Sequence, residues 1–168
     1  MELTEEQLER IRDYVAALRS GEYEQTTWRL GKVMSDGGKA YCCEGVAFER
    51  YHEQFKKFNT QWRATSDDVG ACLFALEPEA EDSRWQKGTY NTAPTNFWRA
   101  MGMLSTRSTA SDFEFQLPSG QTLLDGAEET HFDRIGFAVL NDEGFTFSQI
   151  ADLIEWQFLP PRSGDGDE

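Results

Sequence analysis

Cys42 and Cys43 are adjacent, and they are the side chains of this sequence best suited to nucleophilic chemistry. A thiolate beside an imidazole is an activated nucleophile, and His52 or His131 could supply that base. Small residues follow the pair at positions 45–47, which predicts that both thiols are buried and that their ionisation is disfavoured. We therefore expect the pair to pack as small hydrophobic side chains, and a cysteine-dependent enzyme ranks last among the functional hypotheses.

The sequence predicts no metal site, no cofactor and no carboxylate-based active site. Cys42 and Cys43 lack the two-residue gap of a zinc knuckle, and Cys72 has no second ligand nearby. Adjacent carboxylates such as Asp67 and Asp68 are frequent, but among 30 acidic residues such pairs arise without purpose. A hydrolase needs two carboxylates in opposed environments, and no spacing in the chain indicates them. No catalytic residue is therefore assigned.

Basic, aromatic and small hydrogen-bonding residues alternate between residues 62 and 109. This mixture can stack a nucleobase and hold a phosphate. The net charge of the segment is modest, so a single small nucleotide is a better candidate ligand than a long nucleic acid. In the structural interpretation, which we favour, the tryptophans belong to the core and the arginines are solvated. The candidate ligand-binding residues are Arg63, Arg84, Trp85, Lys87, Trp98, Arg99 and Arg107.

The formal net charge of −14 is unevenly distributed along the 168 residues. Residues 1–107 carry 17 acidic and 14 basic side chains, a net charge of −3, whereas residues 108–168 carry 13 acidic and two basic ones, a net charge of −11. This acidic last third repels nucleic acid and anionic lipid, which have the same sign of charge. An acidic segment is suited to a basic partner, including a protein surface that normally binds phosphate. A requirement for solubility alone would also explain the acidic charge.

The charge distribution leads to a first functional hypothesis, a binding protein without turnover. Its acidic side chains would mimic phosphates in the basic groove of a partner protein. Capture of a small nucleotide by residues 62–109 is the second hypothesis. Neither involves direct binding to nucleic acid or membrane, and the sequence leaves the oligomeric state open. The candidate partner-binding acids are Asp112, Glu114, Glu128, Glu129, Asp133, Asp142 and Glu143.

The first third of the chain contains two predicted helices. Residues 4–18 form an amphipathic helix, with Thr4 as N-cap and Gln7 at the capping-box position. Residues 40–51 predict a short entry into a buried helix. Gly45 weakens that helix by about 1 kcal/mol relative to alanine, so close packing is the best reason for its presence.

The middle of the chain mixes helical and extended patterns. Residues 94–101 predict a third helix, which Gly102 closes. Residues 69–76 are an apolar run that a buried strand or a short helix would explain equally well. Alternating apolar residues at positions 113, 115 and 117 predict a half-buried strand, and the turn that follows predicts a hairpin near 112–124.

The C-terminal elements close the predicted core. Residues 135–140 fit either a third strand or the end of a preceding helix. A turn then leads into a closing helix over residues 146–157, with Thr146 as N-cap and Gln149 at the capping-box position. The acidic tail, residues 160–168, should be disordered because it has no apolar side chains to bury.

Together these elements predict an α+β fold. Several helices surround a small antiparallel sheet in a single compact domain over residues 1–159. No stretch approaches the run of about 18 apolar residues that spans a bilayer, and the acidic N-terminus is unlike a signal peptide. Three cysteines do not suit a disulfide framework, so we expect reduced thiols and a cytoplasmic protein.

Four short blocks of the sequence carry a resemblance to a known family. They cover residues 18–23, 41–47, 94–103 and 140–155, the second with the pattern Cys-Cys-x-Gly-Val-Ala and the last with the pattern Leu-Asn-Asp-x-Gly-x-Thr-Phe-x-x-Ile-Ala-Asp-x-Ile-Glu. In this order they resemble a family of small uncharacterised proteins of tailed phages and some bacteria. The resemblance implies a shared fold and a phage-type origin, with no assigned activity. Glu44 departs from the pattern, since an apolar residue is expected after the cysteine pair.

The resemblance and the acidic last third lead to the same hypothesis about function. A phage-encoded binding protein with an acidic surface is suited to inhibit a host defence component that has a basic surface. Such a protein would act in the cytoplasm of the host cell.

Overall fold

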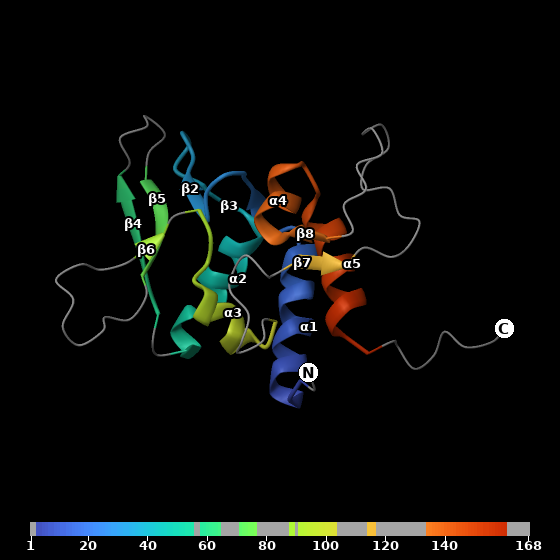
Figure 1. Ribbon diagram of the computed structural model, residues 1–168. Coiled ribbons are helices and arrows are strands. Elements are labelled where there is room, and N and C mark those ends of the chain that lie inside the picture. Colours follow the sequence, from blue (N-terminus) through green and yellow to red (C-terminus); the bar gives the residue numbers. More distant parts are fainter. Residues whose placement is uncertain are drawn as a thin grey trace.

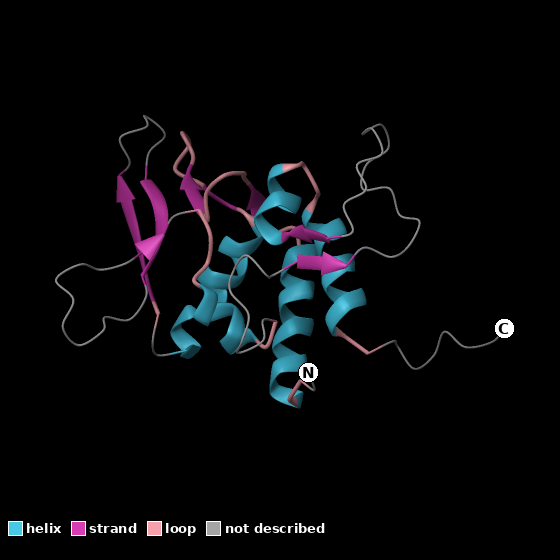
Figure 2. Ribbon diagram, in the orientation of Figure 1, coloured by secondary structure: helices cyan, strands magenta, loops and turns pink. Residues whose placement is uncertain are grey.

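The structure is a computed structural model that describes residues 3–55, 58–64, 71–76, 88–89, 91–103, 114–116 and 134–160. Helices and strands are both present, which confirms the predicted α+β class (Figures 1 and 2). The helices are α1 (Glu5–Arg19), α2 (Cys43–Tyr51), α3 (Thr95–Met101), α4 (Phe137–Asp142) and α5 (Phe147–Phe158), with a 3-10 turn, η1, at His52–Phe55. The strands are β1 (Glu24–Gln25), β2 (Gly31–Val33), β3 (Lys39–Tyr41), β4 (Asn59–Ala64), β5 (Ala71–Leu76), β6 (Gly88–Thr89), β7 (Glu114–Gln116) and β8 (Arg134–Gly136).

The main sheet has the strand order β1-β3-β2-β5-β4, and β6 pairs with β5. The pair of β1 and β3 is parallel and the other pairs are antiparallel, so the sheet is mixed where the sequence predicted an antiparallel one. The apolar run that the sequence could not assign is the strand β5. Figure 1 shows α2 between this sheet and α1, with α5 on the far side of α1.

Both predicted capping boxes are present and set the starts of α1 and α5. In α1 the Thr4 hydroxyl accepts from the Gln7 N–H at 3.2 Å, and the Gln7 side chain accepts from the Thr4 N–H at 3.0 Å. Thr146 and Gln149 repeat the arrangement at α5. These reciprocal bonds satisfy N–H groups that no helical carbonyl can reach, which is why both helices begin where the sequence predicts.

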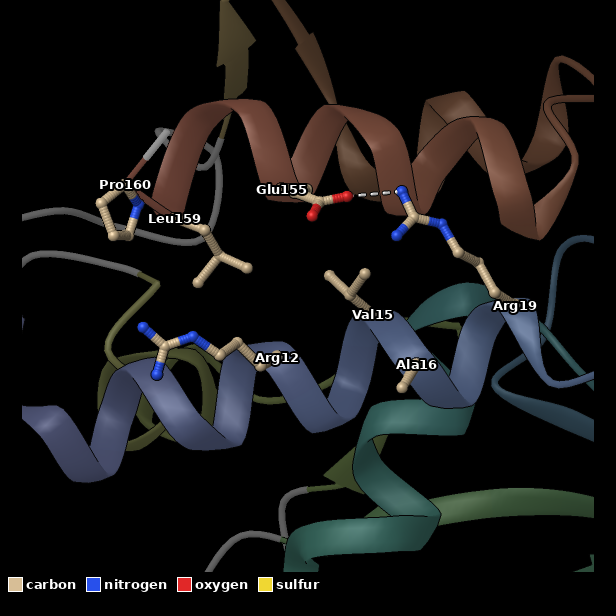
Figure 3. A pocket seen from close by; sticks show the side chains of 7 residues that line it. All are labelled: Arg12, Val15, Ala16, Arg19, Glu155, Leu159 and Pro160. Atoms are coloured by element: carbon tan, nitrogen blue, oxygen red, sulfur yellow. Dashed lines mark hydrogen bonds and ion pairs between the residues drawn. The ribbon is translucent and has the colours of Figure 1, made fainter. Parts of the chain in front are cut away.

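The helices α1 and α5 pack side by side and bury their apolar faces (Figure 3). Arg19 at the end of α1 reaches across to the Asp152 and Glu155 carboxylates of α5, the latter at 2.7 Å. Much of the core comes from these two faces. Their fully or nearly buried side chains are Ile11, Tyr14, Val15, Ala17, Leu18, Phe147, Ile150, Ala151, Leu153 and Ile154.

The second, smaller sheet differs from the predicted hairpin. The expected strand near residue 115 exists as β7, but it pairs antiparallel with β8, Phe115 lying opposite Ile135. The expected return strand at 121–124 lies outside the described residues. The segment that the sequence left open between strand and helix is both, because β8 ends at Gly136 and α4 starts at the next residue.

Gly45 explains how α2 meets the rest of the core. A Cβ atom on Gly45 would lie 1.6 Å from the carbonyl oxygen of Leu30, far inside any permitted contact. The same carbonyl accepts a hydrogen bond from the Cys42 N–H at 3.1 Å. The prediction that close packing requires this glycine is confirmed, since the backbone before β2 lies directly against the first turn of α2.

We predict that Gly45→Ala strongly destabilises the protein. Alanine normally stabilises a helix by about 1 kcal/mol, but here its Cβ must push α2 away from Leu30. The free energy of unfolding, measured by urea denaturation, should fall by about 3 kcal/mol or more. Gly144→Ala is the control, because a Cβ there meets open space and only the positive φ of 90° opposes it, at about 1–2 kcal/mol. A Gly45→Ala protein as stable as the wild type would contradict the prediction.

Candidate functional site

The cysteine pair lies at the buried start of α2. The Cys42 side chain is 4% exposed and the Cys43 side chain is completely buried, and this burial raises the pKa of both thiols. Cys42 is the N-cap of α2, and its sulfur accepts from the Gly45 N–H at 3.3 Å. The carbonyl of Cys43 accepts from the Tyr14 hydroxyl at 2.7 Å. The predicted burial and suppressed ionisation are confirmed, and both cysteines serve packing and capping.

His52, one of the two histidines proposed as a base, does not form a catalytic pair with these thiols. His52 lies at the opposite end of α2, where its ring stacks on Phe48 and Nδ1 contacts the Phe48 carbonyl oxygen at 2.9 Å. His131 lies outside the described residues. A buried thiol without a neighbouring base remains protonated, so the described part of this site has no activated nucleophile.

Glu44, the residue that departs from the family pattern, is a buried acid. Its side chain is 4% exposed, and Oε2 accepts from the Ala93 N–H at 2.6 Å. Burial raises the pKa of Glu44 to about 7, although the hydrogen bonds from Ala93 and from the Trp98 indole oppose the shift. The carboxyl group therefore joins α2 to the segment that starts α3. Sequence analysis missed this role, and the available signal was an acid within a run of small buried residues.

Asn141 is the second buried polar group of this region and is completely enclosed. Its Oδ1 accepts from the Cys43 N–H at 3.2 Å and from the Gln25 amide at 3.1 Å, while its Nδ2 donates to the Thr26 carbonyl at 2.7 Å. Gln25 extends the network by donating to the Phe145 carbonyl at 2.6 Å. The Asn of the C-terminal sequence block thus joins α4 to β1 and to α2.

Asp142 binds the segment that follows β1. Its Oδ1 accepts from the Trp28 N–H at 2.8 Å, and the adjacent Glu143 is exposed. Trp28 has a φ of 65° and is 67% exposed, whereas Leu30 two residues later is completely buried. The sequence assigned no structure to residues 28–30, and no local pattern reveals this outward tryptophan.

Only Asp142 and Glu143 of the predicted partner-binding acids can be placed at the surface. Asp142 is half-buried and already accepts a hydrogen bond, so Glu143 is the more available carboxylate. Glu114 lies in β7, in register with Gly136. The other predicted acids, Asp112, Glu128, Glu129 and Asp133, lie outside the described residues.

The residues predicted to bind a nucleotide are not brought together in the described part of the chain. Trp98 is 2% exposed and packs on the Phe97 and Tyr14 rings, so it offers no face to a base. The Arg99 guanidinium donates to Asn96, and the Arg63 guanidinium lies over the Phe74 ring. Trp98 is therefore a core residue, as the interpretation favoured from the sequence predicted. Four further candidates lie outside the described residues: Arg84, Trp85, Lys87 and Arg107.

A cavity of about 260 Å³ opens between α1 and α5 (Figure 3). Arg12 and Arg19 of α1 line one side of it, and Glu155 of α5 and the C-cap residue Leu159 line the other. Arg19 is paired with acids of α5, and Arg12 pairs with the Glu5 carboxylate at 3.0 Å. Both arginines of this cavity are therefore already paired with carboxylates of the same chain.

Within the described ranges, no three His, Cys, Asp or Glu side chains are arranged to hold a metal ion. No helix in the part of the chain that the structure describes is long and apolar enough to cross a membrane.

The helices and strands make the chain an α+β protein. In its described part, Cys42, Cys43, Glu44 and Asn141 form a buried, hydrogen-bonded centre at the start of α2. The family is shown directly, because the model of a domain of unknown function, DUF8296, matches residues 8–158. The chain belongs to this family. Neither a curated protein nor a solved structure matches the chain.

We predict that the cysteines resist alkylation in the folded protein. Cys42, Cys43 and Cys72 are all buried, and iodoacetamide reacts with an exposed thiolate. Mass spectrometry should show labelling of all three only after urea unfolds the chain. Cys43→Ala should remain folded and lose less than the roughly 2–5 kcal/mol of a large-to-small core change. Rapid labelling of Cys43 alone in the folded state would contradict this and support a covalent mechanism.

We predict that Glu44 makes the protein less stable as the pH rises from about 4.5 to 7. The pKa of Glu44 is raised from an ordinary 4.5 to about 7, so between these values the folded state holds a proton that the unfolded state has lost. The protonated Glu44 carboxyl group therefore stabilises the folded state fully below pH 4.5, and this contribution is lost above pH 7. The free energy of unfolding changes by about 3 kcal/mol across this range. Urea denaturation from pH 4 to 8 should show this slope in the wild type.

The control for that slope is Glu44→Gln, which cannot ionise and should flatten it. Asp13→Asn tests the opposite sign, because hydrogen bonding from Arg50 lowers the pKa of Asp13 and that stabilisation is lost only at more acidic pH. Identical pH profiles for the wild type and Glu44→Gln would show that Glu44 does not control stability in this range.

Proposed function

We propose that the protein is a binding protein without turnover, and that it acts as a phage-type inhibitor of a host defence component in the host-cell cytoplasm. The partner is a protein with a basic surface. The observation that carries the proposal is the surface at Asp142 and Glu143, where the acidic last third of the chain meets solvent beside an exposed tryptophan.

The positions of the potentially reactive groups support binding over catalysis. Cys42, Cys43 and Glu44 are enclosed, and their hydrogen bonds go to neighbouring parts of the same chain. A catalytic group must reach its substrate. The exposed groups of the same region are carboxylates and an indole ring. Tryptophan is enriched at the centre of protein interfaces, and polar groups form the rim around it.

The electrostatics favour a basic protein as partner. Residues 108–168 carry a net charge of −11, which repels phosphates and anionic lipids. In the described part of the chain, no lysine or arginine forms an ion pair with Asp142 or Glu143. Their charge is therefore available to attract cations on a partner and to speed association.

We predict that Glu143→Lys slows association with the partner by roughly 3- to 10-fold while changing dissociation little, because exposed charges act mainly by steering. The partner is first recovered by affinity capture from bacterial lysate, and both rates are then measured by surface plasmon resonance. Raising the salt concentration from about 50 to 300 mM should slow association of the wild-type protein in the same way.

Glu9→Lys is the matched control, because Glu9 is an exposed acid on α1 and the substitution changes the net charge by the same amount. It should affect association less than Glu143→Lys. Equal effects of the two variants would show that Glu143 acts only through the net charge of the protein. An association rate that does not change with salt concentration would refute the acidic surface as the binding site.

A further inference from the structure

Trp28 combines two features that folding alone does not favour. Its φ of 65° lies in the left-handed region, where a large aromatic residue is a steric outlier. Its side chain is 67% exposed, so the ring receives little packing in return. Strained residues of this kind persist where the surrounding structure holds them, and they concentrate at binding sites.

The backbone around Trp28 is held from three sides. The Thr26 carbonyl accepts from the Asn141 amide at 2.7 Å, and the Trp28 N–H donates to Asp142 at 2.8 Å. The Leu30 carbonyl accepts from the Cys42 N–H at 3.1 Å. Two of these bonds come from the Asn-Asp pair that ends α4. This corner of the fold therefore holds the backbone of residues 26–30 in place and leaves the Trp28 side chain exposed.

Arg29 adds a lateral constraint to the same segment. Its guanidinium donates to the Asn91 side chain at 2.7 Å and to the Trp28 carbonyl at 3.2 Å. A backbone segment that is fixed before binding loses little conformational entropy when a partner covers it. Tryptophan is also the side chain most enriched among interface residues that dominate binding energy.

We propose that Trp28 is the apolar anchor of the interface, inserting into an apolar pocket of a protein partner whose rim carries lysine or arginine. The charge near this segment identifies that rim. The Asp142 carboxylate accepts from the Trp28 N–H, and the next residue in the chain, Glu143, is an exposed acid. These two carboxylates outnumber the one cation of Arg29, whose guanidinium donates to the Trp28 carbonyl. The same charge disfavours a lipid headgroup region or a nucleic acid as the surface that covers the ring. This inference rests on the proposed function and names the partner surface that fits it.

The decisive variant is Trp28→Gly. Glycine adopts a positive φ without strain, so the variant should have an unfolding midpoint no lower than that of the wild type. Trp28→Asn tests the same point with a side chain that tolerates this conformation. Trp156→Ala is the matched control, since Trp156 is 51% exposed but lies in the regular helix α5. A large loss of stability in both Trp28 variants would show that the indole ring is needed to stabilise the fold, and it would overturn the proposal.

Binding is tested with a displayed library of folded, disulfide-constrained peptides whose surface positions are randomised, so that members can form an apolar pocket, selected on the wild-type protein. The enriched peptides should combine apolar residues with lysine or arginine, bind Trp28→Gly at least tenfold more weakly, and retain their affinity for Trp156→Ala. Peptides that bind Trp28→Gly as well as the wild type, or a library that yields no enriched peptide, would overturn the anchor.

The same selection separates this inference from the proposed function. Some peptides could bind Trp28→Gly as tightly as the wild type and yet lose affinity at high salt and with Glu143→Lys. That result would contradict the role of Trp28 as an anchor and would still support the acidic surface as the binding site. Peptides that depend on Trp28 but contain no excess of cations would refute the charged rim, and with it the partner chemistry stated here.

Discussion

The enclosed side-chain amide of Asn141 is the interaction on which the rest of this structure depends. Its oxygen and nitrogen bind the start of α2, the side chain of Gln25 and the backbone beyond β1, so one side chain joins three segments that are distant in sequence. A buried polar group that loses its partners costs about 1–3 kcal/mol for each group left unsatisfied. The network therefore permits one arrangement of α4 against α2 and β1, and it fixes the position of the neighbouring Asp142 as well.

Glu44 has a similar role on the other side of α2. Its carboxyl group receives the Ala93 N–H, and burial raises its pKa to about 7. Because polar networks in a low-dielectric interior are strong only when every member is satisfied, the region has little room for rearrangement. The cysteines between these two groups complete the closed centre. The result is a rigid support, and the side chain that it presents to solvent is Trp28.

Such a support suits recognition through a small number of fixed contacts. In the function proposed above, the exposed indole of Trp28 would supply apolar area, and the carboxylates of Asp142 and Glu143 would supply long-range attraction to a basic partner. The two contributions act on different rates, since charge at the edge of an interface governs association and a buried anchor governs dissociation. The proposed inhibitor would benefit from both rates, because it would have to find its target quickly and then remain bound.

The sequence by itself determined the features that depend on near neighbours along the chain. The two capping boxes, the apolar faces of α1 and α5, the glycine at position 45 and the burial of the cysteine pair were all predictable, because helix periodicity and capping act over three or four residues. The tertiary structure decided the rest. Glu44 meets Ala93, 49 positions away, and Asn141 meets Cys43, 98 positions away. The parallel pairing of β1 with β3, the pairing of β7 with β8 and the left-handed backbone of Trp28 likewise depend on contacts between distant segments. A sequence pattern does not contain such partners, because they become neighbours only when the whole core has formed.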